Sequence, residues 1–405
     1  MLRRVSTYLK SSSSFLPLAL ILYFSPLPPL TTLLYLSNLN GFECVPTGLA
    51  DPEELRRQGY AEEFVKLYEE ALLAQRTGRR EGLRNIVEKA MRDLRTSLDM
   101  MDYNVSTMME VLSLVTIVIP TMLASVVVFV DIPAFVPMIT LCSVLGAVVA
   151  LVMGVYSIPP ELWLRRPRLL SLAPLIAFVP AYYFTRDMPL SLAVAAALSA
   201  PLVLLEQRRA VRVFDEALEL LSKASHSSNP VLAGVNLDDL LGKRFYGVAR
   251  AATVTLYTLF TQGGSKYYEG VAKLLAYVRE YASTFRGIRR KALQSFAYAL
   301  VMAAMAAAAM AIVIAVIDFM AGMSLSVAGV YTGLRVPSRE ETLALKTGTD
   351  IFLALSALAY AIAVACMRDG NPLYFPLYLA AILPTSYLSF HLSLRYAPAL
   401  LGVGA

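Results

Sequence analysis

The chain has 405 residues, of which 57% are hydrophobic and only 16% are charged, and its formal net charge is +6. Ordinary soluble domains carry about 25% charged residues, so this composition excludes a typical soluble protein. Several apolar runs reach the roughly 20 residues that a helix needs to cross a bilayer. No segment alternates with the two-residue period of an outer-membrane barrel strand. The composition predicts an all-α, polytopic helical membrane protein.

The few cysteine and histidine residues give no sign of a metal centre or an active site. The three cysteines have no zinc-like spacing and imply no disulfide framework, and His226 and His391 lie far apart in the sequence. No nucleophile–base pairing and no H-E-x-x-H motif is present. We therefore expect no catalytic residue, no bound metal and no cofactor. The excess positive charge lies beside apolar runs, which favours lipid over nucleic acid as a partner.

Residues 1–50 contain the first apolar stretch, 14–37, which is interrupted by Pro26, Pro28 and Pro29. Two interpretations fit this pattern. A single kinked span would carry the basic N-terminus to the outer face, against the positive-inside rule. A re-entrant hairpin would keep that terminus inside. A cleaved signal peptide is disfavoured, because no small-residue cleavage site follows the apolar stretch cleanly.

Residues 51–105 are polar, with apolar residues at helical spacing, and predict a first cytoplasmic helical domain. Residues 106–206 predict four transmembrane helices. The arginine-rich loop 159–168 between the second and third of them should be cytoplasmic. Four crossings return the chain to its starting side, so 51–105 and 207–290 should share one face. The four predicted spans lie near 108–130, 134–157, 169–184 and 188–206.

Residues 207–290 predict a second cytoplasmic helical domain, which makes a loose tandem repeat with the first. A basic cluster then marks the membrane boundary. Residues 291–405 predict three further transmembrane helices and an external loop at 319–347. The three predicted spans lie near 293–318, 348–367 and 372–394.

Gly263 and Gly264 stand directly before an amphipathic helical run. A phosphate-binding P-loop would need G-x-x-x-x-G-K-[ST]. Here Lys266 comes two residues after Gly264, and no Ser or Thr follows it. We therefore interpret the pair as structural glycines, which let the chain turn sharply and start a helix packed against its neighbours.

Two groups of basic residues are candidates for docking an acidic protein partner. The group at the membrane boundary has a second interpretation as an anchor beside anionic lipid. The group further from the membrane is the better docking candidate, although a solvated face is the alternative. The candidates are Arg286, Arg289 and Arg290 at the boundary, and Lys243, Arg244 and Arg250 further away.

Two stretches of the second half resemble a known family. They are FDEALELLSKASHSSNPVLAGV (214–235) and GGSKYYEGVAKLLAYVREYASTFRGIRRKAL (263–293). They are similar to the membrane platform proteins of type IV pilus-like machines, which include the F component of type II secretion and the archaellum and archaeal pilus relatives. Glu110 and Pro120 are similar to an acidic-then-proline feature of archaeal members. These two residues are therefore candidates for a pathway through the membrane, with interfacial water as the simpler explanation for Glu110.

The resemblance implies a non-enzymatic platform in the cytoplasmic membrane. Its helical domains would engage a hexameric secretion ATPase, and its spans would guide pilin-like subunits from the bilayer into a growing filament. The platform would act as a homo-oligomer. A transporter is the main alternative, since broken spans and internal repeats are typical of transporters, but the spans lack polar residues at mid-depth. An intramembrane enzyme is disfavoured by the missing nucleophile–base or metal set.

Overall fold

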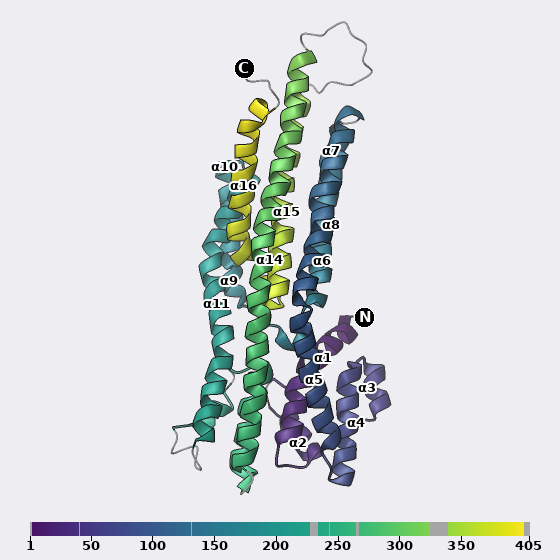
Figure 1. The fold of residues 1–405 in the computed structure, drawn as a ribbon, viewed down its shortest axis with the longest axis vertical. Helices are drawn as coiled ribbons and strands as arrows, with labels where there is room; N and C mark the ends of the chain where they lie inside the picture. Colours follow the sequence, from purple (N-terminus) through teal and green to yellow (C-terminus); the bar gives the residue numbers. More distant parts are fainter. Residues whose placement is uncertain are drawn as a thin grey trace. The chain divides into compact units, whose positions relative to one another are not determined.

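The computed structural model describes residues 2–39, 41–130, 132–226, 234–242, 244–264, 267–324 and 339–400. Within these residues every regular element is a helix (Figure 1), so the all-α prediction is confirmed. Six of the described helices are long and apolar enough to cross a membrane, which indicates a multi-pass membrane protein. They are Met101–Val126, Ala134–Ser157, Met188–Ser225, Tyr267–Phe319, Thr347–Asp369 and Pro372–Ala397.

Two predicted apolar stretches are not among these six. The predicted span 169–184 falls in a shorter apolar helical segment, Leu169–Thr185. The stretch 14–37 forms two helices, α1 (Leu2–Phe24) and α2 (Pro29–Ser37). The predicted external loop 319–347 is also partly helical, because α14 runs to Ser324 and α15 begins at Arg339.

The contacts divide the chain into two compact units. Unit 1 contains Met1–Met100, Pro159–Arg165 and Arg208–Ile288. Unit 2 contains Met101–Ile158, Arg166–Gln207 and Arg289–Ala405. This grouping differs from the predicted domain boundaries, because both polar helical segments and the N-terminal apolar stretch belong to one unit.

Unit 1 is a helical bundle around α1 and α13 (Gly247–Gln262), which pack against each other. Residues Leu16 and Leu18 to Leu22 of α1 are almost completely buried, and so is most of α13. Apolar residues of α5 at helical spacing are buried too. The surrounding helices are α3 (Pro52–Gln58), α4 (Glu62–Thr77), α5 (Glu81–Asp99), η2 (Pro160–Leu162), α12 (Leu237–Leu240), the last part of α11 (Met188–Ser225) and the first part of α14 (Tyr267–Ser324).

The apolar character of 14–37 therefore has a reason that neither sequence interpretation included. Ser25, Pro26 and the two following residues separate α1 from α2, and both helices lie within unit 1. The helix α1 packs on α4, α5 and α13. An apolar run of this length serves equally as a membrane helix or as the central helix of a bundle, and in this chain it forms a bundle core.

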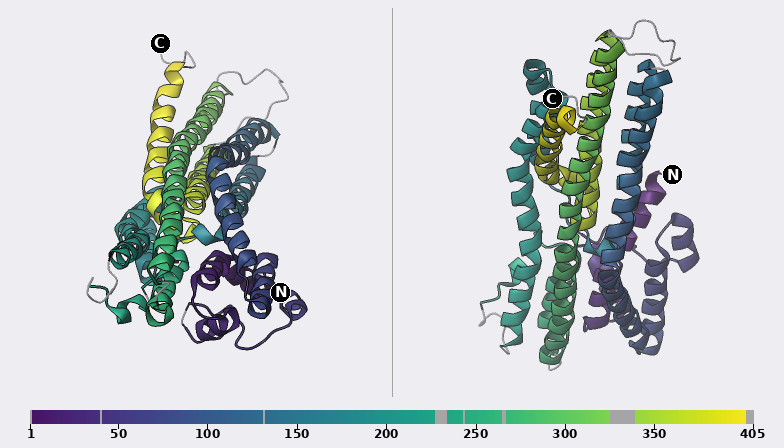
Figure 2. Two further views of the ribbon diagram at one scale, coloured as in Figure 1. Left: turned by 60° about the horizontal axis from the view of Figure 1, so that its bottom comes forward. Right: turned by 45° about the horizontal axis from the view of Figure 1, so that its top comes forward.

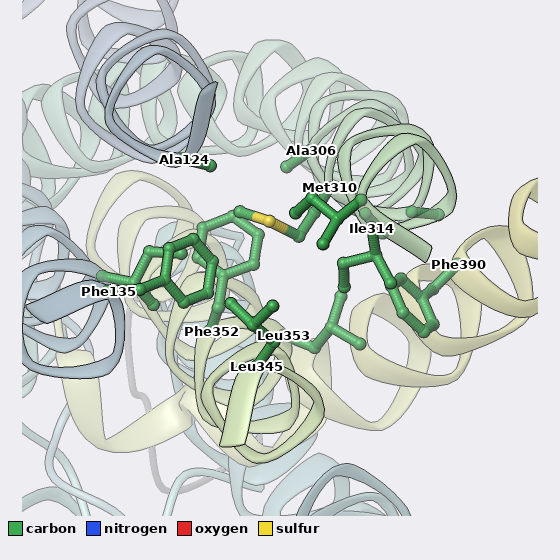
Figure 3. Close-up of a cluster of buried hydrophobic side chains, with 13 residues drawn as sticks. Ala124, Phe135, Ala306, Met310, Ile314, Leu345, Phe352, Leu353 and Phe390 are labelled. Carbon is green, nitrogen blue, oxygen red and sulfur yellow. The ribbon is translucent and has the colours of Figure 1, made fainter. Parts of the chain in front are cut away.

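Unit 2 contains the apolar helices. Its helix α15 packs along α8, and α16 follows α15 as its neighbour (Figure 2). A buried cluster joins them to α7 and α14: Phe135, Met310, Ile314, Phe352 and Phe390 point toward one another in Figure 3. The elements are α6 (Met101–Ser113), η1 (Leu114–Val118), α7 (Ile119–Val130), α8 (Ile132–Ser157), α9 (Leu169–Leu172), η3 (Ala173–Ala177), α10 (Phe178–Thr185), the first part of α11 (Met188–Ser225), the last part of α14 (Tyr267–Ser324), α15 (Arg339–Asp369), η5 (Pro372–Tyr374) and α16 (Phe375–Leu400).

Candidate functional site

The first span changes its helical geometry between the two predicted pathway residues. The segment η1 between Glu110 and Pro120 is a π-helix, in which the N–H of Ile119 donates to the carbonyl of Leu114. Proline has no N–H, and its ring displaces the carbonyl four residues earlier. That carbonyl belongs to Thr116, inside the π-helical segment. Such π-turns are frequently found at functional sites.

The inner side of this π-turn is held by buried contacts within unit 2. The Thr116 hydroxyl donates to the carbonyl of Leu112 at 2.8 Å and hydrogen-bonds the Tyr360 hydroxyl of α15 at 2.8 Å. Helix α8 approaches closely on the same side, since a Cβ atom at Gly146 would lie 2.9 Å from Thr116 Cγ2. These contacts hold the π-turn against α8 and α15.

The outer side of the same span carries Glu110. Its carboxylate is exposed and accepts a hydrogen bond from Ser106 Oγ at 3.0 Å. Exposed Leu114, Val118 and Met122 continue the row at spacings of four residues. Pro120, in contrast, is buried. Glu110 is therefore an acidic group at one end of an exposed apolar row, whereas Pro120 shapes the helix from inside.

The predicted docking residues lie in different environments. Arg286 pairs with Asp215, and Arg244 Nε lies 3.8 Å from Glu216 Oε2; both arginines are exposed. Arg290 is also exposed. Lys243 lies outside the described residues.

Arg250 does not lie on an exposed face, so the prediction that it could dock a partner is corrected. The residue is only 4% exposed, within α13, and its Nη1 donates to the carbonyl of Gly242 at 2.8 Å. Burial lowers the pKa of its guanidinium. Its sequence neighbourhood, GVARAATV, is apolar on all sides and indicates a buried helix rather than a solvated one.

The glycine pair lies in the turn between α13 and α14. Gly263 follows the last residue of α13, and its N–H donates to the carbonyl of Leu259 at 2.8 Å. A Cβ atom at Gly263 would lie 2.2 Å from that oxygen. Gly264 has a φ of +51°, a left-handed conformation that favours glycine. Both positions thus use glycine for backbone geometry.

Asp369 was not among the predicted site residues, and it lies at the centre of a buried polar cluster in unit 2. Gln207 Nε2 donates to both carboxylate oxygens, at 2.9 and 2.8 Å. The Tyr378 hydroxyl donates to Oδ2 at 2.6 Å. Arg289 Nη2 lies 3.2 Å from Oδ1, and the two side chains are 13% and 0% exposed. Arg289 was predicted to anchor or dock, and it instead forms a buried ion pair.

The local sequence explains how Asp369 reaches this position. Helix α15 ends at Asp369, and Gly370 follows with a φ of +66°. The side chain of Asn371 then accepts from the N–H of Leu373 at 3.1 Å and starts the next helical turn. A signal was available: an acidic residue within R-D-G-N-P, a tight turn between two apolar runs. Its partners, however, come from segments that are distant in the sequence.

A second buried carboxyl lies in unit 1, on the loop that connects two apolar helices. Glu161 is on η2, which packs against α1, and the Tyr281 hydroxyl donates to its backbone carbonyl at 2.8 Å. Part of the residue's surface still reaches solvent, but protein surrounds most of the carboxyl. Burial raises the pKa of Glu161 to about 7, and the nearby carboxylates Glu63 and Asp93 add to the effect.

We expect Glu161→Gln to remove a pH-dependent loss of stability. A carboxyl whose pKa is raised on folding, from 4.5 to about 7, stabilises the folded state below its ordinary pKa. That stabilisation is lost as the pH rises through the folded value, at about 1.4 kcal/mol per pKa unit. The wild type should therefore unfold at a lower temperature at pH 8 than at pH 5, and the variant should show a smaller difference. Fluorescence of Trp163, the only tryptophan, measures the unfolding; equal pH dependence in both proteins would contradict the assignment.

Comparisons with known proteins do not identify a family for this chain. No family model matches it, no curated protein matches it, and no solved structure matches it. Among the described residues, no group of three or more His, Cys, Asp or Glu side chains is placed to hold a metal ion.

Proposed function

We propose that the protein is a platform in the cytoplasmic membrane for the assembly of a type IV pilus-like filament. One observation carries the proposal. Three segments that are separated in the sequence by apolar helices, Met1–Met100, Pro159–Arg165 and Arg208–Ile288, come together in one compact helical unit. A platform needs such a unit, because a motor outside the membrane must bind a folded surface. That surface must also be covalently connected to several spans.

The topology supports a single side of the membrane for unit 1. Residues 101–158 contain two of the six long apolar helices, so the chain returns to its starting side at Pro159. Residues 166–207 must then also cross twice, which requires Leu169–Thr185 to act as a span. Its twelve α-helical residues and five 3-10 residues would extend about 28 Å, close to the roughly 30 Å of a hydrocarbon core.

The distribution of charge supports the cytoplasmic side. Arg165, Arg166 and Arg168 lie in the connection between the second and third crossings, and Arg290 and Lys291 lie where α14 enters unit 2. Basic residues beside spans are concentrated on the cytoplasmic face. We therefore place unit 1 in the cytoplasm, where a hexameric ATPase would supply the energy.

The exposed arginines of unit 1 are the proposed docking groups. Arg244 and Arg286 are paired with Glu216 and Asp215 on the surface. Exposed ion pairs contribute only about 0–1 kcal/mol, so acidic side chains of a partner can replace these pairings at little cost. In the membrane, the row that begins at Glu110 is the proposed contact for a pilin-like subunit, because a carboxylate at a span surface is stabilised by a basic partner.

The test is co-purification of the detergent-solubilised protein with the cell's hexameric secretion ATPase. We expect the wild type to retain the ATPase and the double variant Arg244→Glu, Arg286→Glu to lose it, because like charges then face each other. The matched control is Arg84→Glu, which changes an equally exposed arginine that pairs with Glu88 on α5. The control should bind like the wild type.

Three results would count against parts of the proposal. Binding by the double variant would discard the docking residues and keep the platform. Loss of binding in the control as well would indicate a general effect of charge. No binding by the wild type in several detergents would contradict the platform itself, and a substrate-uptake assay would then test the transporter alternative.

A further inference from the structure

The carboxylate of Asp369 connects three separate parts of unit 2. Gln207 belongs to α11, Arg289 belongs to α14, and Tyr378 belongs to α16, which follows the turn that begins at Asp369. All four side chains contribute to one set of bonds, and Gln207 Nε2 also lies 3.2 Å from the Tyr378 hydroxyl. The guanidinium of Arg368 stacks over the Tyr378 ring at 5.9 Å. The turn between α15 and α16 is thus bonded to both other helices at a single carboxylate.

The two bonded helices are the ones that continue into unit 1. Gln207 is the last residue that α11 contributes to unit 2, and Arg289 is the first that α14 contributes. After Asp369 the described chain passes through η5 into α16, and at this turn side-chain bonds join the α15–α16 hairpin to α11 and α14. Asp369 therefore bonds the hairpin at the two positions where these helices leave unit 2.

Each of the two helices has a weak point close to its bond with Asp369. Pro201 lies inside α11, before Gln207, where it removes one helical hydrogen bond. Gly287 lies inside α14, two residues before Arg289, and glycine lowers the resistance of a helix to bending. Gly287 also packs closely on Leu98, since an added Cβ atom would lie 3.1 Å from it. Kinks in long helices arise at such residues.

We propose that Asp369 is a latch that controls whether α11 and α14 move with the α15–α16 hairpin. In the latched state, the carboxylate binds Gln207, Arg289 and Tyr378 and keeps the two helices together. In the released state, these bonds are broken and the helices bend at Pro201 and Gly287. A buried ion pair suits this use, because such a pair adds little net stability, whereas removing one of its partners is strongly destabilising. The latch does not rest on the proposed function, since it concerns the isolated protein.

The test measures the distance between α11 and α14 by pulsed electron paramagnetic resonance, in lipid nanodiscs and without any partner. Spin labels are placed at Leu205→Cys and Leu293→Cys, whose side chains are 50% and 48% exposed, after the three native cysteines are replaced by alanine. With Asp369→Asn or Arg289→Gln, we expect the distance distribution to become about twofold broader, because the buried ion pair between Asp369 and Arg289 is broken. The double variant Asp369→Asn, Arg289→Gln should give a distance distribution no broader than that of either single variant, because both substitutions break the same ion pair.

Three controls separate a latch from general loosening of the fold. Lys291 lies on α14, as Arg289 does, and forms an exposed ion pair with Asp102 of α6. Lys291→Gln removes this pair and should leave the distance distribution unchanged. A second label pair, at Val194 and Met305, reports the same two helices away from the latch and should be unchanged in every variant. Should Asp369→Asn fail to fold, Tyr378→Phe removes only the hydroxyl that donates at 2.6 Å, and should give an intermediate width.

An unchanged distribution at 205 and 293 in the folded Asp369 and Arg289 variants would overturn the proposal. Equal broadening of both label pairs would overturn it as well, because it would reduce Asp369 to a general stabiliser of unit 2. Broadening confined to the pair beside Asp369 would support the latch, whether or not the ATPase binds.

Discussion

Replacing Arg80 by methionine should lower the stability of unit 1 by about 2–4 kcal/mol, because three partly buried carbonyl groups lose a charged donor. Arg80 Nη1 donates to the carbonyls of Tyr23, at 3.3 Å, and Ser25, and Nη2 donates to that of Leu27 at 2.6 Å. These carbonyls lie at the end of α1 and in the turn S-P-L-P-P, whose prolines have no N–H to offer. The measurement is the temperature at which the buried thiol of Cys44 reacts with a fluorogenic maleimide.

Cys44 reports on this region because its thiol is buried in unit 1, and replacing the other two cysteines makes the signal specific. Arg79→Met is the matched control, since the neighbouring arginine is exposed, and exposed substitutions usually change stability little. If Arg80→Met and Arg79→Met shift the reaction temperature equally, the hydrogen bonds of Arg80 to the three carbonyls do not contribute to the stability of unit 1.

Replacing Gly154 by alanine should loosen the packing of α8 on α15. A Cβ atom at Gly154 would lie 2.4 Å from Cys366 Cβ and 3.1 Å from its sulfur, so a helix backbone has to move. Overpacking of this kind costs about 1–3 kcal/mol. Small residues allow this close approach between membrane helices. In a protein that keeps only Cys366, we expect the thiol, 1% exposed in the native chain, to react with the maleimide at a lower temperature.

The control for this prediction is Gly48→Ala, at a position where an added Cβ atom meets nothing within 4 Å. That substitution should leave the reactivity of Cys366 unchanged. If Cys366 reacts at the same temperature in both variants, the packing of α8 on α15 does not depend on the close contact at Gly154.

The sequence predicted the positions of the six long apolar helices, although it also predicted spans at 14–37 and 169–184 that are not among these six. The predicted spans 134–157 and 372–394 correspond to Ala134–Ser157 and Pro372–Ala397. The prediction is possible because a span depends on local composition. A helix of about 20 consecutive apolar residues is long enough for the bilayer, and it pairs its own backbone N–H and C=O groups. The structural use of Gly263 and Gly264 was predictable for the same reason, since it depends on the conformation of a few adjacent residues.

The candidate site was less predictable, because exposure depends on which helices lie beside each other. Arg286 and Arg289 are one turn apart in a basic cluster, yet Arg286 is exposed and Arg289 is buried against Asp369. Arg250 was grouped with exposed residues and is buried in α13. Charge alone does not distinguish these environments.

The sequence by itself determined that this chain is helical, that it is a membrane protein, and where its long apolar helices lie. Only the tertiary structure decided that helix α1 of the apolar stretch 14–37 packs against α4, α5 and α13. It alone also brought Gln207, Arg289 and Asp369 together. The physical reason is that helix formation and membrane insertion follow from neighbouring residues, whereas burial and ion pairing follow from segments that are far apart in the chain and meet only when the helices pack.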